Sequence, residues 1–197
     1  LSMRNTKINI FVDCHIFDKN YQGTTTYIKG LYQELILDKN KHFFLAAVHI
    51  ENLINVFGSH PNVTYLPLQS NNKFVRLFLE IPRLIRKNKI DFAHFQYITP
   101  PIKACKYIVT IHDVLFLEYP HFFPRLYRIK NYLLFKRSAK QADIVCTVSP
   151  FSKDKIKHFF NVNSIITPNA VDPVFYEKYD KKSLQESVKT QFGLEQY

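Results

Sequence analysis

The segment from Tyr107 to Val114 joins a strand pattern to two side chains that could do chemistry. Its first four residues, up to Thr110, are β-branched or aromatic, which predicts a buried strand, and His112 and Asp113 follow closely. In an open parallel α/β sheet, ligands bind just beyond the carboxyl ends of the strands. We therefore expect His112 to act as an acid or base, or to donate to a substrate hydroxyl or phosphate. The strand-end position favours this role over that of a histidine satisfied by a backbone carbonyl.

A second polar strand end lies near the start of the sequence. Residues 7–12 are typical of a buried strand that ends at Asp13, and a polar loop with Gly23 leads to a helix. Free N–H groups and the positive end of a helix favour phosphate at such a turn. The loop lacks both G-x-G-x-x-G and G-x-x-x-x-G-K-[ST], which disfavours the usual NAD and ATP sites. From these residues alone, an ordinary βα turn remains an alternative.

Other motifs favour structure over chemistry. Ser149 ends a predicted strand and opens a helix, where its hydroxyl would either cap the helix or bind a ligand, and we favour the cap. Ser152 and Lys155 match S-x-x-K, but S-D-N and K-T-G are absent, so the match is attributed to chance. The histidines show no H-E-x-x-H motif, and the cysteines have no zinc spacing, so no metal site is predicted.

Strand and helix patterns alternate along the chain and would position these candidates. They predict an α/β fold, a Rossmann-like parallel sheet of about seven strands with helices on both faces. Strands are expected at 7–12, 43–49, 62–68, 91–96, 107–110, 142–148 and 164–167. Helices are expected at 24–35, 52–57, 73–89, 125–141, 150–160 and 183–192. We expect one domain over 7–175, and a linker with a helix over 176–197 that leads towards a domain absent from this chain.

Three helices carry more specific expectations. The first should have a threonine N-cap, and its Gly30 should mark close packing on the sheet. Pro82 should kink or split the helix over 73–89, whose apolar face is Phe74, Leu77, Phe78, Ile81, Leu84 and Ile85. The helix over 125–141 combines basic and aromatic residues, which suits an anionic membrane surface or nucleic acid. The alternative for that helix is a solvated basic face with a core stripe of Leu126, Ile129, Leu133 and Leu134.

The composition is globular and basic. Lys and Arg number 27 against 16 Asp and Glu, a net charge of +11. This charge suits an anionic partner, such as nucleic acid, an acidic membrane or a phosphorylated small molecule, although a lysine-rich proteome would also explain it. Three scattered cysteines indicate a reducing cytoplasm. No signal peptide and no apolar run of ~18 residues is present in the sequence.

Four motifs together resemble the N-terminal, acceptor-side domain of family 4 retaining glycosyltransferases, which have the GT-B fold. They are V-D-C-H-I with G-T-T-T-Y-I-K-G-L (12–31), T-I-H-D-V-L-F (110–116), S-A-K-Q-A-D-I-V-C-T-V-S-P-F-S-K-D (138–154) and I-T-P-N-A-V-D (166–172). The resemblance implies two facing Rossmann-like domains, of which this chain is the first. The second would bind the nucleotide-sugar, so the isolated chain is expected to be inactive.

The resemblance also implies a reaction and its partners. A hexosyl group, with mannosyl or glucosyl as candidates, would pass from a nucleotide-sugar to a glycan or lipid-linked acceptor with retention and without a metal or cofactor. The expected setting is bacterial cell-surface polysaccharide synthesis, for example lipopolysaccharide, in the cytoplasm with peripheral membrane contact. Nucleic acid is not expected as a partner in this case. The alternative is a flavodoxin-like module that contacts nucleic acid or another anionic partner through its basic helix.

Site residues follow from the matched motifs. His112 is expected beside the reacting sugar as the catalytic residue. Donor or acceptor binding is expected at Asp13, Gly23, Thr24, Thr25, Asp113, Ser149, Asn169 and Asp172. Thr25 stands where the family usually has a second glycine, and its β-branched side chain restricts the approach of phosphate to the backbone.

Overall fold

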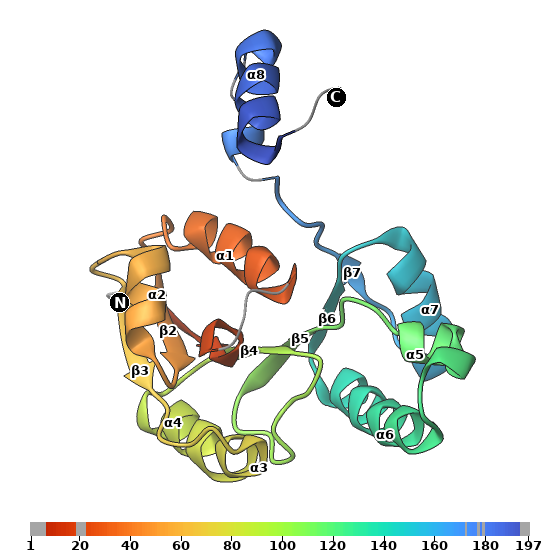
Figure 1. Cartoon of the computed structure of the whole chain (residues 1–197). Helices are drawn as coiled ribbons and strands as arrows, with labels where there is room; N and C mark the ends of the chain where they lie inside the picture. Colours follow the sequence, from red (N-terminus) through yellow and green to blue (C-terminus); the bar gives the residue numbers. More distant parts are fainter. Residues whose placement is uncertain (1–6, 19–22, 172, 177, 179, 194–197) are drawn as a thin grey trace.

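The computed structural model describes residues 7–18, 23–171, 173–176, 178 and 180–193 (Figure 1). It contains a parallel sheet of seven strands in the order β3-β2-β1-β4-β5-β6-β7. The strands are β1 (Ile8–Asp13), β2 (Lys41–Ala47), β3 (Val63–Pro67), β4 (Phe92–Gln96), β5 (Lys106–Thr110), β6 (Ile144–Thr147) and β7 (Ile165–Ile166). The Rossmann-like α/β fold predicted from the alternating pattern is confirmed.

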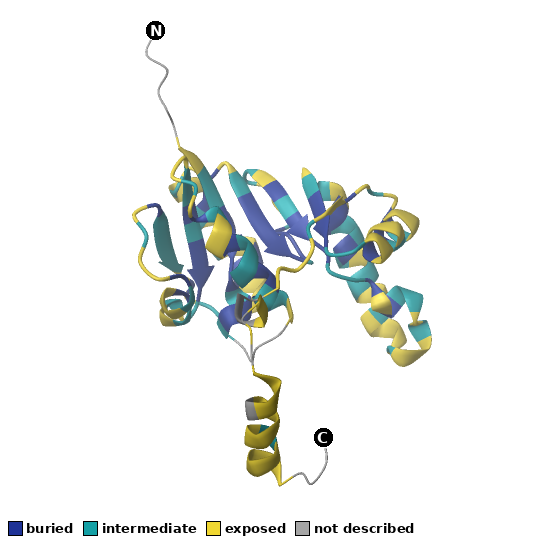
Figure 2. Ribbon diagram, turned by 90° about the horizontal axis from the view of Figure 1, so that it is seen from above, coloured by how far each residue is buried: buried dark blue, intermediate teal, exposed yellow. Residues whose placement is uncertain are grey.

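Helices cover both faces of the sheet (Figure 1). One face carries α1 (Gly23–Leu35) and α2 (Ile50–Phe57), and the other carries α3 (Lys73–Val75), η2 (Arg76–Glu80), α4 (Ile81–Lys87), α6 (Arg125–Gln141) and α7 (Pro150–Phe160). Short helical turns that were not predicted are η1 (His15–Asp18), α5 (Leu115–Glu118) and η3 (Pro120–Phe122). Beyond β7 come η4 (Pro173–Tyr176) and α8 (Lys181–Phe192), which stands apart from the sheet with mostly exposed side chains (Figure 2).

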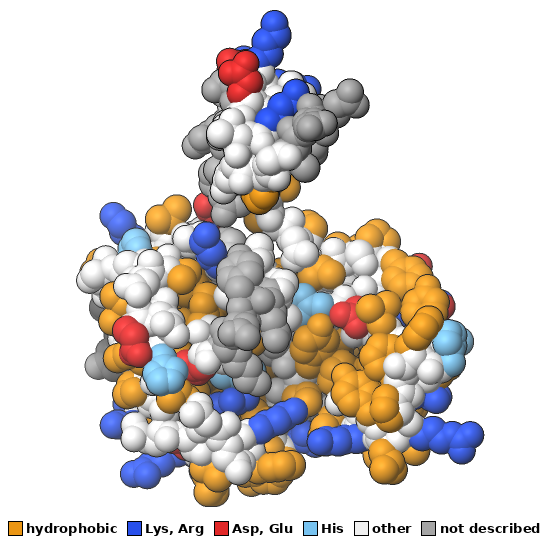
Figure 3. All heavy atoms as spheres, in the orientation of Figure 1, with side chains coloured by type: hydrophobic (Ala, Val, Ile, Leu, Met, Phe, Trp, Pro, Cys, Tyr) orange, Lys and Arg blue, Asp and Glu red, His pale blue; other side chains and the backbone are white. Residues whose placement is uncertain are grey.

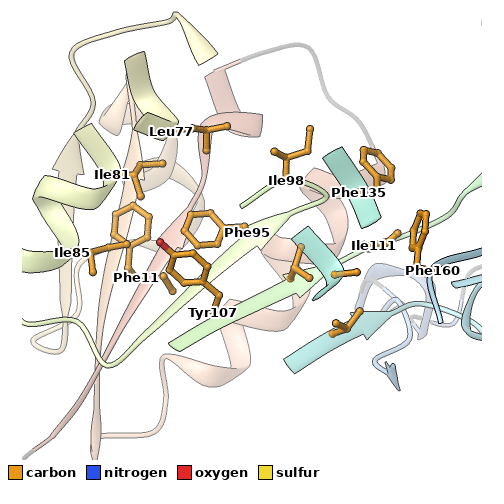
Figure 4. Packing of buried hydrophobic residues seen from close by; sticks show 14 of the residues in the cluster. Phe11, Leu77, Ile81, Ile85, Phe95, Ile98, Tyr107, Ile111, Phe135 and Phe160 are labelled. Atoms are coloured by element: carbon orange, nitrogen blue, oxygen red, sulfur yellow. The ribbon is translucent and has the colours of Figure 1, made fainter. Parts of the chain in front are cut away.

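Two hydrophobic cores lie on the two faces. Successive strand residues point to opposite faces, so Phe11 belongs to one core and Val12 to the other. The larger core packs Phe95 and Tyr107 against helix residues such as Ile81 and Ile85 (Figure 4). These strands are buried on both faces, which explains their continuous apolar runs.

The strand order reverses direction between β1 and β4. The chain leaves β1 for β2 and β3 on one side, and β4 then pairs with β1 on the other side. Ligands of open α/β sheets bind at such a reversal, outside the carboxyl ends of the strands. Asp13 ends β1, Gln96 ends β4, and His112 follows β5, so all three meet at this edge.

Pro82 divides its helix as predicted, and the mechanism is a π turn. Pro82 lies in the first turn of α4. The segment directly before α4, η2, is a π-helical turn, and at its end the N–H of Ile81 donates to the carbonyl of Arg76. Proline has no N–H to donate, and a wider turn accommodates the missing helical bond.

The predicted core stripe of α6 is wrong for three of its four residues. Leu126, Ile129 and Leu133 are 82%, 58% and 59% exposed, and the helix instead buries Phe135, Ser138 and Ala139. The small residues Ser138 and Ala139 allow close approach to the sheet, and the Ser138 hydroxyl accepts from the N–H of Thr99 at 3.0 Å. Only Leu134 of the stripe packs against the core. Likewise, Phe74 and Phe78 of the helix over 73–89 are exposed.

Two expectations for α1 are also corrected. The helix begins at Gly23, so Thr24, Thr25 and Thr26 lie within it and none of them is its N-cap. A Cβ on Gly30 would lie 3.2 Å from the Cβ of Ala170. The close neighbour of Gly30 is therefore the segment after β7 and not the sheet.

Candidate active site

His112 lies beyond β5 with its ring bonded to a side chain from the neighbouring strand. Its Nε2 is 2.7 Å from Oε1 of Gln96, and its ring meets Tyr27 edge-on at 4.9 Å between centroids. An amide oxygen only accepts, so Nε2 carries the proton and Nδ1 is left as an acceptor. Burial lowers the pKa of His112 to about 4, although the Asp113 carboxylate acts in the opposite direction. The imidazole is therefore neutral at pH 7, with one tautomer selected by Gln96.

A buried polar network continues from Gln96 into the sheet. Nε2 of His94 lies 2.8 Å from the Thr110 hydroxyl, and its Nδ1 lies 2.7 Å from the Tyr32 hydroxyl. The same Thr110 hydroxyl is 3.3 Å from that of Tyr27, which meets Thr167 at 2.8 Å. Burial, with a smaller effect from His112, lowers the pKa of His94 to about 3. The network ties α1 and Thr167, the residue after β7, to β4, which ends at Gln96, and to β5, which is followed by His112.

Asp113 is held by Tyr97 and by the start of α5. Its carboxylate accepts from the Tyr97 hydroxyl at 3.3 Å and from the N–H of Leu115 at 3.2 Å. Tyr97 has a φ of 62°, a left-handed conformation that is rare for a bulky residue and collects at functional sites. Its ring stacks on Phe135 at 5.0 Å and approaches His112 at 5.4 Å.

His112 opens into a pocket of about 520 Å³. The pocket is lined by Gly23, Thr24, Tyr97, His112, Asp113, Val148, Ser152 and Asn169. Among the residues that the structure describes, no atom lies within 4 Å of a Cβ built on Gly23. The buried hydroxyl of Thr24 has no hydrogen-bond partner within the described part of the chain. The N-terminus of a 13-residue helix thus faces the same space as the imidazole.

Asp13 lines an adjoining pocket of about 730 Å³, which shares Tyr97 and Asp113 with the first. Oδ1 of Asp13 lies 2.9 Å from Nδ1 of His15, and Oδ2 lies 3.7 Å from Nε of the buried Arg76. Burial alone would raise the pKa of Asp13, but His15 and Arg76 together hold it below 3.8. Asp13 is therefore an anion at neutral pH.

Comparison with known proteins identifies the chain's family. The sequence profile of Glycosyltransferase Family 4 matches residues 21–175, which is most of the chain. The chain belongs to glycosyltransferase family 4. This confirms the family predicted from the four motifs. A search among curated proteins found no match.

A solved structure of a glycosyltransferase has a similar fold. A glycosyltransferase from Rickettsia africae ESF-5 superposes with a TM-score of 0.57 at 11% identity, covering 94% of this chain and 49% of that one. The chain thus spans about half the length of that protein. A protein from Listeria monocytogenes assigned as a UDP-N-acetylglucosamine 2-epimerase has a TM-score of 0.48 at 13% identity, covering 77% of this chain and 42% of that one.

The structure brings most of the predicted site residues of this family 4 domain together. His112, Asp113, Gly23, Thr24 and Asn169 share one pocket, and Asp13 lies in the adjoining one. Thr25 and Ser149 line neither of these two pockets.

Thr25 is buried on another side of α1, where it lines a pocket with Phe17 and Lys29. The Ser149 hydroxyl accepts from the N–H of Ser152 at 3.1 Å, which is the predicted helix cap. Asp172 lies outside the described residues. Within the described residues, no three histidine, cysteine or carboxylate side chains gather to hold a metal ion.

Sequence reasoning missed the partners of the family 4 site. Gln96 was only the last residue of a predicted strand, although its strand-end position was the signal used for His112. Tyr27 and Arg76 lay inside helix patterns, where nothing in the spacing distinguished them from packing or surface residues. Tyr97 carried no signal, because a positive φ at a tyrosine is imposed by its surroundings.

Proposed function

We propose that the chain is the acceptor-binding part of a retaining glycosyltransferase that moves a hexosyl group, with mannosyl or glucosyl as candidates, from a nucleotide-sugar to a glycan or lipid-linked acceptor. The observation that carries this proposal is a neutral His112 that shares its pocket with Gly23 and Thr24 at the N-terminus of α1. Family membership supports the reaction class. We further propose, from the motif resemblance, that the setting is cytoplasmic synthesis of a bacterial cell-surface polysaccharide such as lipopolysaccharide.

In the proposed reaction, the bond between the anomeric carbon and the diphosphate breaks, and an acceptor hydroxyl oxygen forms the new glycosidic bond. The hydroxyl proton leaves with the diphosphate. The leaving group gains negative charge, which the N–H groups at Gly23 and Thr24 and the positive end of α1 would stabilise. This supports the proposal that no metal is required. Among the described residues, no atom lies within 4 Å of a Cβ built on Gly23, which leaves space for a phosphate beside the helix start.

His112 would contact the transferred sugar. With Nε2 bonded to Gln96, its Nδ1 is an acceptor for a sugar hydroxyl. A neutral ring also avoids repulsion of the positive charge that develops on the sugar during transfer.

The larger pocket would hold the acceptor. It combines the carboxylates of Asp13 and Asp113, which accept from hydroxyl groups, with the rings of Tyr97, Tyr127 and Phe116, which suit the apolar face of a sugar. Its contact with the His112 pocket through Tyr97 and Asp113 would place an acceptor hydroxyl beside the donor sugar.

The test is a transfer assay on the full protein encoded by the gene, with radiolabelled nucleotide-sugars, lipid and glycan acceptors, and EDTA present. His112→Ala should lower the transfer rate by about 100-fold or more, while His158→Ala on α7, away from the pockets, should not. NMR of the product should show the anomeric configuration of the donor. The isolated chain of 197 residues should show no turnover. A normal rate for His112→Ala, or an inverted product, would contradict the proposal.

A further inference from the structure

Arg76 is a buried cation whose hydrogen-bonding capacity the fold does not use up. It is the one lysine or arginine that is buried among the residues the structure describes, with 6% of its surface exposed. Within that part of the chain, its buried Nε has no hydrogen-bond partner. A buried donor without a partner costs free energy, so such a group calls for an explanation. Arg76 also begins the π turn η2, and π turns are frequent at functional sites.

An acceptor atom of Asp13 faces this donor. Oδ1 of Asp13 accepts from the N–H of His15 at 3.2 Å and from Nδ1 of the same residue at 2.9 Å. Oδ2 of Asp13 lies 3.7 Å from Nε of Arg76, which is too far for a direct hydrogen bond. A hydroxyl group can bridge such a gap, because it accepts from Nε–H and donates to the carboxylate at the same time. We call these two residues the Asp13–Arg76 pair.

The Asp13–Arg76 pair lines the larger pocket, at a distance from His112. Tyr97 and Asp113 line the same pocket and also the His112 pocket. Asp13 ends β1, and β4 lies between β1 and β5, the strand that precedes His112. Neighbouring strands are about 4.8 Å apart, so the ends of β1 and β5 are separated by roughly 10 Å. A group bound at the pair therefore lies away from a sugar beside His112, on the side proposed for the acceptor.

The charges around the larger pocket favour a neutral group over an anion. Among the described residues that line it, the carboxylates are Asp13, Asp18 and Asp113, and the cations are Lys73 and Arg76. In Figure 3 most Lys and Arg side chains lie along the lower rim of the molecule, over α3 and α6, and acidic and histidine side chains lie across its middle. An anion bound at Arg76 would lie against ionised Asp13, whereas a hydroxyl group would satisfy both residues.

We propose that the Asp13–Arg76 pair binds a hydroxyl group of an uncharged acceptor sugar and rejects a phosphate or carboxylate at this point. This inference rests on the proposed function and deepens it, because it gives the class of acceptor sugar and names Arg76 as a specificity-determining residue. Any phosphate of a lipid carrier would then lie outside this part of the pocket. An ion pair that only holds the fold together would give no response to a sugar.

The first experiment follows the Nε–H resonance of Arg76 by NMR while sugars are added to the chain. The neutral probes are the methyl glycosides of glucose, mannose, galactose and N-acetylglucosamine, and the anionic probes are methyl glucuronide and inorganic phosphate. At least one neutral glycoside should shift this resonance to saturation and bind roughly tenfold or more tightly than methyl glucuronide, because like charges repel. The Nε–H of Arg83, an exposed residue of α4, is the internal control and should not shift.

A charge variant separates recognition from a purely structural ion pair. Asp13→Asn removes the negative charge beside Arg76 and keeps the size of the side chain. Methyl glucuronide should therefore gain roughly tenfold in affinity and shift the Arg76 resonance. Asp154→Asn removes an exposed carboxylate on α7 and is the matched control, which should leave the affinities unchanged. Circular dichroism checks that both variants are folded.

Kinetics of the full protein encoded by the gene give a second measurement. Arg76→Lys keeps the positive charge but loses the guanidinium donor, so the KM for the acceptor should rise by roughly tenfold. The KM for the nucleotide-sugar should stay within about threefold, because the donor does not touch Arg76. Arg83→Lys makes the same substitution on the exposed surface of α4 and should change neither value.

Tighter binding of methyl glucuronide or phosphate than of every neutral glycoside, or no shift of the Arg76 resonance with any probe, would overturn the inference. An unchanged acceptor KM in Arg76→Lys would do the same. Binding of a neutral sugar at Arg76 in a protein that transfers no sugar would leave this inference standing and remove the proposed function. Sugar transfer to an acceptor that is bound without Arg76 would do the reverse.

Discussion

His112 takes its chemical state from neighbours that are distant in the chain. Gln96 holds the ring at 2.7 Å and selects its tautomer, and burial keeps it neutral. The amide nitrogen of Gln96 lies 3.4 Å from Nε2 of His94. Two neutral histidines thus lie on either side of one buried amide, which makes Gln96 a positioning residue for the site.

We predict that Gln96→Glu raises the pKa of His112 by at least about one unit, because an anion beside the ring favours its charged form. The change keeps the size of the side chain. Gln33→Glu, on the exposed surface of α1, is the matched control and should leave His112 unaffected. Imidazole ¹⁵N chemical shifts followed across pH report both the titration and the tautomer. An unchanged His112 titration in Gln96→Glu would exclude the positioning role.

Helix α1 packs closely against the segment after β7. Gly30 and Ala170 approach so tightly that a Cβ at Gly30 would lie 3.2 Å from that of Ala170. The same segment carries Thr167, which bonds to Tyr27 of α1, and Asn169 in the His112 pocket. Close packing here therefore sets how near Asn169 lies to the start of the helix.

A double-mutant cycle measures this contact. Alanine in place of glycine favours a helix by up to about 1 kcal/mol, but at position 30 the gain is opposed by crowding against Ala170. Gly30→Ala should therefore stabilise the chain by about 0.5 to 1 kcal/mol more in the Ala170→Gly background than in the wild type. Urea denaturation gives the four free energies of unfolding. Additive effects would show that the two residues do not touch.

The whole molecule should lose stability in mild acid because burial lowers the pKa of two histidines, His94 and His112, of which His94 has the larger shift. In the unfolded chain a histidine has a pKa of about 6.5, whereas burial lowers the pKa of His94 in the folded chain to about 3. The contribution of His94 to stability is therefore present above pH 6.5 and is lost as the pH falls towards 3. Between pH 7 and pH 5 this corresponds to about 2 kcal/mol in the free energy of unfolding.

Urea denaturation at several pH values tests this prediction. His94→Gln should show a smaller loss between pH 7 and pH 5, since glutamine does not titrate. His158→Gln, an exposed position on α7, should retain the wild-type loss. A pH dependence that is the same in all three proteins would mean that His94 is not the group responsible.

Local sequence was sufficient to predict the strands, most helices and the edge where the site lies. The reason is that carboxyl ends of parallel strands meet at one edge, so Asp13 and His112 could be placed there from their positions alone. The Ser149 cap and the split at Pro82 were also predictable, because each depends on bonds within a few residues.

Tertiary structure alone decided which side of α6 is buried and which side chain meets His112. Apolar residues occur on both sides of α6, so periodicity could not choose between them, and the choice came from the close approach of Ser138 and Ala139 to the sheet. The partner Gln96 depends on the order of the strands, which places β4 beside β5. Local spacing carries no information about strand order, so the tautomer and protonation state of His112 could be inferred only from the folded chain.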